Sequence, residues 1–158
     1  MTITVARATR SELQPTQSLL YEYFDAIGVV VRDAPEDIVA FLTDPHCALW
    51  LAYADGHPAG CVALRALPLD GVAAATECKR LYVRPAYRGR GIAEALLDAM
   101  EAHAAASGAA WIYLDSKDDL AHALRHYQRR AYQPCARYND NPQATIFMRK
   151  ALASLANP

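Results

Sequence analysis

Hydrophobic and polar positions along the chain follow two different spacings. An alternation with a period of two predicts a strand at 3–7, and apolar segments at 48–53, 60–65 and 73–83 predict three further strands. The second and third of these strands flank the turn sequence Asp55-Gly56-His57-Pro58, so we expect them to form an antiparallel hairpin.

A spacing of three to four residues between apolar side chains predicts four helices. The first begins near Ser11 and stops at Gly28, and the second begins at Pro35, whose fixed φ suits the first turn of a helix. The third covers 91–106 and ends before Gly108. The fourth carries Leu120, Ala123, Leu124 and Tyr127 on one face, behind a cap at Asp118 or Asp119.

The remaining apolar segments complete the series of elements. A continuous apolar run at 110–114 suits a strand covered on both faces, and two final strands are expected at 132–138 and 145–148. The predicted order is βααβββαβαββ, which indicates an α+β fold. A length of 158 residues with 53% hydrophobic residues fits one domain, which we expect to span 1–153, followed by a loose tail at 154–158.

Composition and charge argue against several classes of protein. The net charge of −1 is unlike that of a general nucleic-acid or membrane-surface binder, and no segment approaches the roughly 18 apolar residues of a membrane span. The N-terminus lacks the basic and apolar regions of a signal peptide, so we expect a cytoplasmic protein. The four cysteines form no CxxC pair, and His122 and His126 lack the glutamate of an HExxH site, so we expect neither a disulfide framework nor a bound metal.

Basic residues and glycines gather where the strand 73–83 leads into the third helix. Five of the sixteen Lys and Arg residues lie within twelve positions: Lys79, Arg80, Arg84, Arg88 and Arg90. Glycine lets the backbone approach a ligand, and the first N–H groups of a helix attract anions. No lysine follows Gly91 as in a nucleotide-hydrolase P-loop, and Ile92-Ala93-Glu94 does not complete a GxGxxG fingerprint. The segment therefore predicts a site for a phosphate-bearing cofactor of another kind.

The six residues Arg88-Gly89-Arg90-Gly91-Ile92-Ala93 resemble the acyl-CoA-binding motif of the GNAT family of N-acetyltransferases. The resemblance continues upstream through 77–85 and downstream through 124–133, and the order of elements agrees from 3 to 150. It implies one domain built on a mixed, mostly antiparallel twisted sheet of about six to seven strands, flanked by about four helices. The family usually has Gly-Phe where Ala131-Tyr132 stand in this chain.

The resemblance implies acetyl-CoA as the co-substrate, bound along one strand and the loop that follows it. The backbone of Leu81 and Val83 would bond the pantetheine arm as if it were a neighbouring strand, and the N–H groups of 88–93 would bind the pyrophosphate. The implied cofactor-binding residues are Leu81, Tyr82, Val83, Arg88, Gly89, Arg90, Gly91, Ile92 and Ala93. The alternative for this loop is a solvated basic turn.

By the same resemblance, Glu77 is the base that takes a proton from the acceptor amine, and Tyr127 is the acid that protonates the leaving thiolate. We expect Glu77 to share a face of its strand with Leu81 and Val83, where apolar surroundings would raise its pKa. The N–H of Leu81 would hold the oxyanion of the tetrahedral intermediate. Two alternatives stay open: Glu77 as a surface residue paired with a neighbouring basic side chain, and Tyr127 as a core side chain.

The acceptor site is expected between the first two helices and the last pair of strands. Its candidate side chains are Tyr23, Phe24, Arg32, Arg137, Tyr138 and Asn139, and the two arginines would suit an acceptor that carries a carboxylate. The implied reaction transfers an acetyl group to a primary amine of a small molecule, amino acid or peptide by direct attack in a ternary complex. A protein N-terminal or lysine acetyltransferase, a non-catalytic acyl-CoA sensor and a nucleotide-phosphate binder stay open as alternatives, as does a homodimer.

Overall fold

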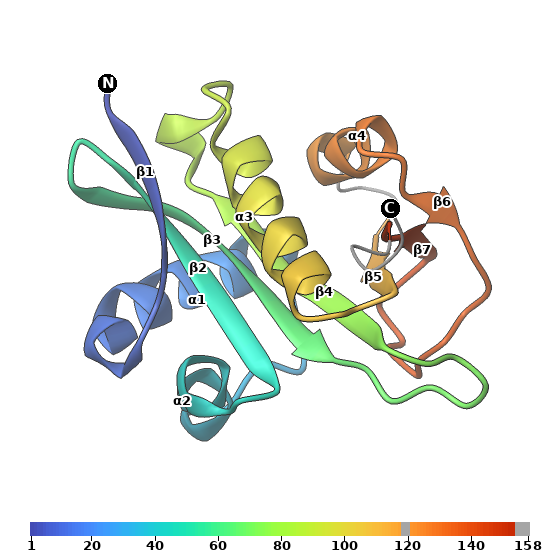
Figure 1. Cartoon of the computed structure of the whole chain (residues 1–158). Helices are drawn as coiled ribbons and strands as arrows, with labels where there is room; N and C mark the ends of the chain where they lie inside the picture. Colours follow the sequence, from blue (N-terminus) through green and yellow to red (C-terminus); the bar gives the residue numbers. More distant parts are fainter. Residues whose placement is uncertain (118–120, 154–158) are drawn as a thin grey trace.

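The computed structural model describes residues 1–117 and 121–153, whose strands form one twisted sheet (Figure 1). The strands are β1 (Ile3–Arg7), β2 (Cys47–Ala54), β3 (His57–Ala66), β4 (Ala75–Val83), β5 (Trp111–Ser116), β6 (Gln133–Pro134) and β7 (Ile146–Ala151). Their order across the sheet is β1-β2-β3-β4-β5-β7-β6. Neighbouring strands are antiparallel except β4 and β5, which are parallel. The expected α+β fold with a mixed, mostly antiparallel sheet is therefore confirmed.

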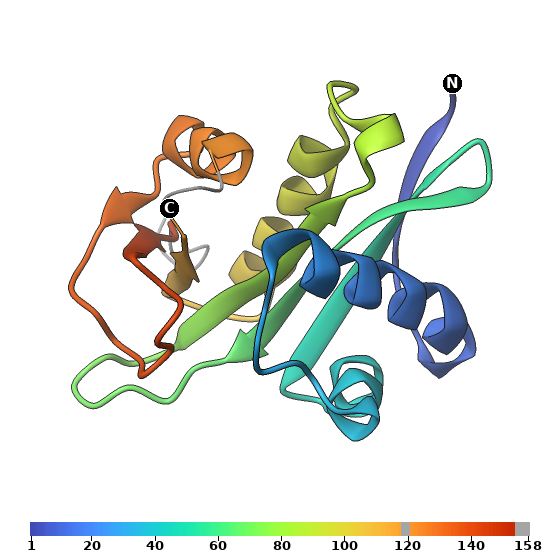
Figure 2. The ribbon, with the colours of Figure 1, turned by 180° about the vertical axis from the view of Figure 1, so that it is seen from behind.

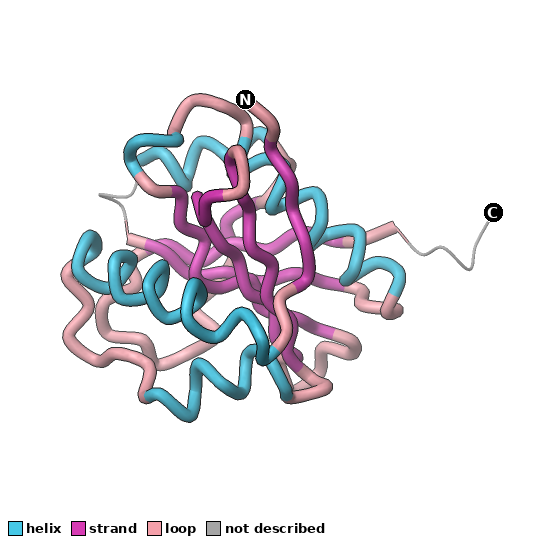
Figure 3. Tube along the Cα trace, turned by 90° about the vertical axis from the view of Figure 1, so that its left-hand side faces the viewer, coloured by secondary structure: helices cyan, strands magenta, loops and turns pink. Residues whose placement is uncertain are grey.

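Helices cover both faces of this sheet. They are α1 (Leu13–Ile27), α2 (Pro35–Thr43), α3 (Ile92–Ala106) and α4 (Ala121–Arg129). The apolar cluster under α1 and α2 includes Leu49 and Leu51, whereas the cluster under α3 and α4 includes Val62 and Leu64. Figure 2 shows α1 and α2 in front of the sheet when the molecule is seen from behind, and in Figure 3 the strands lie between the helices.

Burial on both faces explains why β2 is apolar throughout. In β2, Trp50 and Ala52 pack into the cluster under α3, and Leu49 and Leu51 pack into the cluster under α1. Helices shield both faces of this part of the strand from water, so apolar side chains are favoured at successive positions. The first and third helices end where the sequence predicts, and Gly28 terminates α1 with a φ of 66° in the left-handed region.

The sixth strand is shorter than the alternation predicts, whereas the last strand, predicted at 145–148, covers Ile146–Ala151. Only Gln133–Pro134 pairs with β7, and the N–H of Cys135 donates one further bond to the carbonyl of Phe147 at 2.9 Å. Beyond this point the chain leaves the sheet and forms the β6–β7 loop, residues 135–145. Arg137 holds this loop by donating to the carbonyls of Asn139, Asn141 and Ala144. The strand predicted at 132–138 is therefore wrong beyond residue 134.

Some predictions lie outside the described residues, namely the cap at Asp118 or Asp119, the apolar Leu120 and the tail at 154–158. The fourth predicted helix is confirmed over Ala121–Arg129. None of the described helices is long and apolar enough to cross a membrane. Within 1–117 and 121–153, no three His, Cys, Asp or Glu side chains come close enough together to hold a metal ion.

Candidate active site

The parallel strands β4 and β5 separate part of the way along the sheet. They pair over a short stretch that ends with Glu77 opposite Tyr113. β4 nevertheless stays paired with β3 as far as Val83, and β5 stays paired with β7 as far as Ser116. Beyond Glu77 the two central strands (β4 and β5 in Figure 1) therefore diverge. We call the space between them the sheet gap.

An extra residue in β4 changes which face its side chains occupy. The register against β3 shifts by one residue, and Arg80 adopts a φ of 61°. Such a bulge resets the alternation of side chains. Cys78 and Leu81, three positions apart, consequently pack into the same cluster under α3, and Glu77 points to the opposite, α1 side. The expectation that Glu77 shares a face with Leu81 and Val83 is therefore wrong.

A cleft of about 570 Å³ opens beside the sheet gap. It is lined by the end of β4, the loop between β4 and α3, the C-terminal part of α1 and one face of α4. All of the residues expected to bind the cofactor line this cleft except Arg90. Arg90 reaches toward the start of the chain instead, where its Nη1 lies 3.2 Å from the Sδ atom of Met1.

The backbone of β4 faces the sheet gap at alternate residues. The N–H of Arg84 donates to the carbonyl of Ala59 on β3 at 2.8 Å. Because strand hydrogen bonding alternates, the N–H and C=O groups of Leu81 and Val83 turn away from β3. The carbonyl of Val83 accepts a bond from Arg88 Nε at 3.0 Å, from the side of the loop. These two residues therefore present their strand-edge backbone groups to the cleft.

The loop between β4 and α3 turns through two glycines. Gly89 and Gly91 have φ angles of 76° and 79°, which other residues adopt only with strain. Gly91 is the N-cap residue of α3, and because it has no side chain, no side-chain oxygen of its own covers the first N–H groups of the helix. Such N–H groups and the helix dipole attract anions, and here they lie at the rim of the cleft.

Glu77 is fully buried, at 0% exposure, and its surroundings are polar rather than apolar as expected. Its Oε1 accepts a bond from Arg65 Nε at 2.8 Å, and its Oε2 lies 3.5 Å from Lys79 Nζ. From the β6–β7 loop, the Tyr138 hydroxyl donates to Oε2 at 2.6 Å, and Asn139 Nδ2 donates to it at 3.4 Å. We call the part of the α1 side around Glu77, Tyr138 and Asn139 the acceptor face.

Tyr127 lies on the core side of α4 and is 6% exposed. Its ring packs against Tyr132 with 5.6 Å between the centroids. Burial raises the pKa of the Tyr127 hydroxyl well above its usual range. The nearby Cys78 thiol is the second cause, and Tyr23 and Asp115 contribute in the same direction. Cys78 directly follows Glu77 on β4, so the thiol that acts on Tyr127 lies where the sheet gap begins.

The aromatic side chains expected at the acceptor site do not all reach it. Tyr23 lines the cleft, and burial raises its pKa to about 12. Tyr138 reaches Glu77 from the β6–β7 loop. Phe24, however, is 1% exposed and belongs to the apolar cluster under α1, so it is a core residue and not an acceptor-binding one.

Both arginines expected to bind an acceptor carboxylate have partners within the protein. Arg32 Nη1 lies 2.7 Å from Asp25 Oδ1, and its guanidinium carbon lies 5.9 Å from the ring centroid of Phe24. Arg137 donates to three carbonyls of the β6–β7 loop and lies 4.6 Å from the ring centroid of Phe147. The two guanidinium groups stabilise their own loops, which leaves the expected carboxylate recognition without support.

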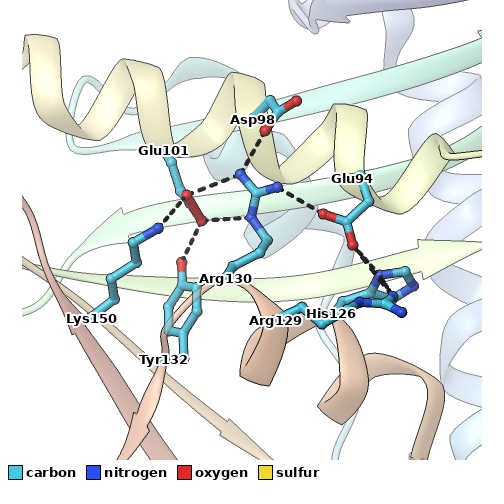
Figure 4. Close-up of polar contacts among 8 residues, drawn as sticks. All are labelled: Glu94, Asp98, Glu101, His126, Arg129, Arg130, Tyr132 and Lys150. Atoms are coloured by element: carbon cyan, nitrogen blue, oxygen red, sulfur yellow. Dashed lines mark hydrogen bonds and ion pairs between the residues drawn. The ribbon is translucent and has the colours of Figure 1, made fainter.

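A network of ion pairs joins α4 to α3 beside the cleft (Figure 4). Arg130, which follows α4, donates to three carboxylates of α3: Glu94 at 2.8 Å, Asp98 at 2.7 Å and Glu101 at 3.0 Å. Further contacts join His126 and Arg129 to Glu94, and Tyr132 and Lys150 to Glu101. Burial alone would raise the pKa of Glu101, but the bonds from Arg130 and Lys150 outweigh it and hold that pKa below its ordinary value.

Two parts of this region escaped the sequence interpretation although each has a signal in the sequence. Asp115 follows Tyr113 by two positions, so strand alternation alone places both on one face. The acidic side chains Glu94, Asp98 and Glu101 recur at helical spacing and form a stripe along α3. A stripe of one charge on a helix predicts an oppositely charged neighbour, which Arg130 supplies.

Known proteins share this architecture. The family model described as acetyltransferase (GNAT) family matches residues 13–132. A GNAT-family acetyltransferase from Staphylococcus aureus superposes with a TM-score of 0.81 at 18% identity, covering 96% of this chain and 100% of that one. PaiA N-acetyltransferase from Thermoplasma acidophilum, solved with coenzyme A, gives 0.74 at 17% identity over 96% and 100% of the two chains. NAA60 from Arabidopsis thaliana, solved with a bisubstrate analogue, gives 0.73 at 20% identity over 96% and 97%, and no curated protein matches by sequence.

Proposed function

Because the chain belongs to the GNAT family of acetyltransferases, we propose that it transfers the acetyl group of acetyl-CoA to a primary amine. The acceptor is the amine of a small molecule, an amino acid or a peptide, and it attacks the thioester directly in a ternary complex. The observation that carries the proposal is the sheet gap, whose open strand edge and adjoining cleft end at the N-terminus of α3.

The chemistry of the cleft fits acetyl-CoA. The pyrophosphate would lie on the N–H groups at the start of α3, where Gly89 and Gly91 bring the backbone close. The pantetheine amides would bond the outward-facing backbone of Leu81 and Val83, and the Leu81 N–H would hold the oxyanion. The volume of about 570 Å³ is within the range of roughly 300 to 1,000 Å³ that small-molecule sites occupy.

The acceptor amine must lose a proton before it can attack. Neutralising a lysine-like amine at pH 7 costs about 4.6 kcal/mol, so a base is needed. We assign this role to Glu77, which is reached through Tyr138, because the carboxylate itself is fully buried. The Tyr138 hydroxyl, which donates to Glu77 Oε2 at 2.6 Å, gives its proton to the carboxylate as its oxygen takes one from the amine.

Collapse of the tetrahedral intermediate releases a thiolate, which needs a proton. We assign this donation to Tyr127, whose raised pKa keeps the hydroxyl protonated at neutral pH. Its hydroxyl hydrogen-bonds with the thiol of Cys78, the first residue of β4 beyond the paired stretch, which supports a position at the sheet gap, where the thioester would lie.

The proposal is tested by measuring thiol release from acetyl-CoA over a panel of amines. Release that depends on both acetyl-CoA and one of the amines supports the transferase. A protein that binds acetyl-CoA but releases no thiol with any amine is the non-catalytic sensor. Thermal-shift titrations with acetyl-CoA, ATP and NAD identify the ligand, since a ligand at a hundred times its Kd adds about 2.7 kcal/mol to the free energy of unfolding. Stabilisation by ATP or NAD in place of acetyl-CoA would reject the proposal.

A further inference from the structure

Asp115 lies on β5 beyond the point where β5 separates from β4. Its neighbour Leu114 packs into the apolar cluster under α3, so strand alternation directs Asp115 to the α1 side. Tyr113, two positions earlier, is the residue that pairs with Glu77. The Asp115 carboxylate is half-buried and therefore stands on the acceptor face, at the edge of the sheet gap.

The hydrogen-bond partners of Asp115 are uncharged. Its Oδ2 accepts from Asn139 Nδ2 at 2.6 Å and from Asn141 Nδ2 at 3.3 Å. By contrast, the carboxylates of Glu77 and Asp33 each form ion pairs with basic side chains. In the part of the chain that the structure describes, Asp115 forms no ion pair with a lysine or an arginine.

The charge of Asp115 acts on side chains from three other elements. Its charge helps to raise the pKa of three tyrosines, although burial is the larger cause in each: Tyr23, Tyr127 and Tyr138. They belong to α1, α4 and the β6–β7 loop. Asn139 Nδ2 also lies 3.4 Å from Glu77 Oε2, so a single amide joins Asp115 to the carboxylate assigned as the base.

The charge of Asp115 also acts on Arg80. Arg80 donates to Asp33 through Nε at 3.0 Å and through Nη2 at 2.8 Å, so it already has a carboxylate partner. Arg80 is thus held by Asp33, and Arg65 and Lys79 by Glu77, so Asp115 is the carboxylate of the acceptor face that has no ion-pair partner among the described residues.

We propose that Asp115 binds the ammonium group of the acceptor, so that the substrate is an amine that enters the site protonated. The inference rests on the acetyl transfer proposed above. A half-buried carboxylate held by two neutral amides accepts a charge-assisted hydrogen bond from an ammonium without losing an ion pair first. Arg32 and Arg137 are occupied by their own loops, so an acceptor carboxylate finds no corresponding partner in them.

Asp115 stays ionised throughout the reaction and orients the nitrogen. One proton of the ammonium passes through Tyr138 to Glu77, and the freed lone pair forms the C–N bond. The C–S bond then breaks, and the thiolate takes the hydroxyl proton of Tyr127. The second proton released by the nitrogen restores the hydroxyl of Tyr127, and the proton on Glu77 leaves to solvent.

The variant Asp115→Asn tests this role with two acceptors that differ in charge. Benzylamine is an ammonium ion at neutral pH, whereas aniline is uncharged. We expect Asp115→Asn to raise the KM for benzylamine on the order of 10- to 100-fold and to leave the KM for aniline within about twofold. The control Asp140→Asn removes an exposed charge from the β6–β7 loop and should leave both values unchanged. An equal loss with both amines, or no loss with benzylamine, would overturn the inference.

Binding measured without turnover separates the inference from the proposed function. Benzylamine and benzyl alcohol, its uncharged counterpart, are titrated calorimetrically into the complex of the wild-type protein with CoA. We expect benzylamine to bind at least about tenfold more tightly, and Asp115→Asn to remove this preference. Equal affinity of the wild-type protein for the two ligands, or no binding of either, overturns the inference. Because this comparison uses the wild-type protein, it holds even if Asp115→Asn does not fold. A clear preference without thiol release would instead reject the acetyl transfer and retain an amine-binding Asp115.

Discussion

The two halves of the site are built in different ways. The half proposed to bind the cofactor consists of the end of β4, the loop with Gly89 and Gly91, and the first turn of α3, which are consecutive in sequence and present backbone groups. The acceptor half takes single side chains from β4, β5 and the β6–β7 loop, such as Glu77, Asp115 and Tyr138. A site made of local backbone needs one short segment in the right conformation, whereas a site made of distant side chains needs the whole sheet in register.

The largest expected effect is a loss of kcat that leaves the affinity of the cofactor half for acetyl-CoA intact. We expect Tyr127→Phe and Glu77→Gln each to lower kcat on the order of 10²- to 10⁴-fold, because each removes a proton-transfer group. The affinity for acetyl-CoA should stay within a few-fold, since the anion site at α3 is untouched. Thiol-release kinetics and calorimetric titration of acetyl-CoA measure the two quantities. The control Tyr132→Phe, which removes the neighbouring hydroxyl bonded to Glu101, should retain kcat; unchanged kcat in both test variants would contradict the assigned roles.

The ion-pair network of Figure 4 supports the wall of the cleft and also carries Tyr127. Removing the guanidinium in Arg130→Met leaves Glu94, Asp98 and Glu101 without their shared partner, and we expect the free energy of unfolding to fall by about 2 to 3 kcal/mol. Chemical denaturation measures this change. Arg10→Met, at an exposed position outside the network, should change it by less than about 0.5 kcal/mol. Similar losses in the free energy of unfolding for the two variants would show that the network does not hold α4 against α3.

The same network predicts how stability responds to acid. The bonds from basic side chains lower the pKa of Glu94 and Glu101 below the reference value of 4.5. A carboxyl group with a lowered pKa stabilises the fold above pH 4.5, and this contribution is lost as the pH falls below that value through the folded-state pKa. The wild-type protein should therefore lose more stability between neutral pH and pH values below 4.5 than Arg130→Met does. Parallel pH profiles of the two proteins would refute this coupling.

A glycine substitution tests the cofactor half without touching the acceptor face. Ala at position 91 would have to keep a φ of 79°, at a cost of about 1 to 2 kcal/mol, and relaxing this strain would move the backbone that carries the first N–H groups of α3. We expect Gly91→Ala to weaken acetyl-CoA binding about tenfold. Gly108→Ala imposes the same strain at a φ of 85° at the other end of α3 and should leave that affinity unchanged. Equal affinities in the two variants would mean that the Gly91 backbone does not bind the cofactor.

The smallest expected effect concerns the turn after α4. Ala131 stands where the family usually has glycine, and it adopts a φ of 70° in the left-handed region. The backbone of this turn is therefore strained at Ala131. Because glycine adopts such a φ without strain, Ala131→Gly should add about 0.5 to 1 kcal/mol to the free energy of unfolding. Ala102→Gly, on the exposed side of α3, should instead remove about 1 kcal/mol. Thermal unfolding distinguishes the two signs.

Most of the fold could be predicted from local patterns in the sequence. The errors of that prediction have local structural causes. The stop of α1 at Gly28 and the start of α2 at Pro35 agree with the structure. The strand predicted at 132–138 stops early because Arg137 binds the carbonyls of its own loop, which no alternation of residues indicates. The face occupied by Glu77 was wrong because the bulge at Arg80 shifts the register through a backbone torsion and leaves no periodic signal.

The family and the loop proposed to bind the cofactor could both be predicted from the sequence, because they depend on motifs and on an order of elements that consecutive residues specify. The acceptor face was decided only by the tertiary structure. Asn139 lies 62 positions from Glu77 and 24 from Asp115, yet one amide nitrogen contacts both carboxylates. Such contacts depend on strand register, on the bulge in β4 and on the path of the β6–β7 loop, so the charge that Asp115 presents to an acceptor follows from the folded sheet.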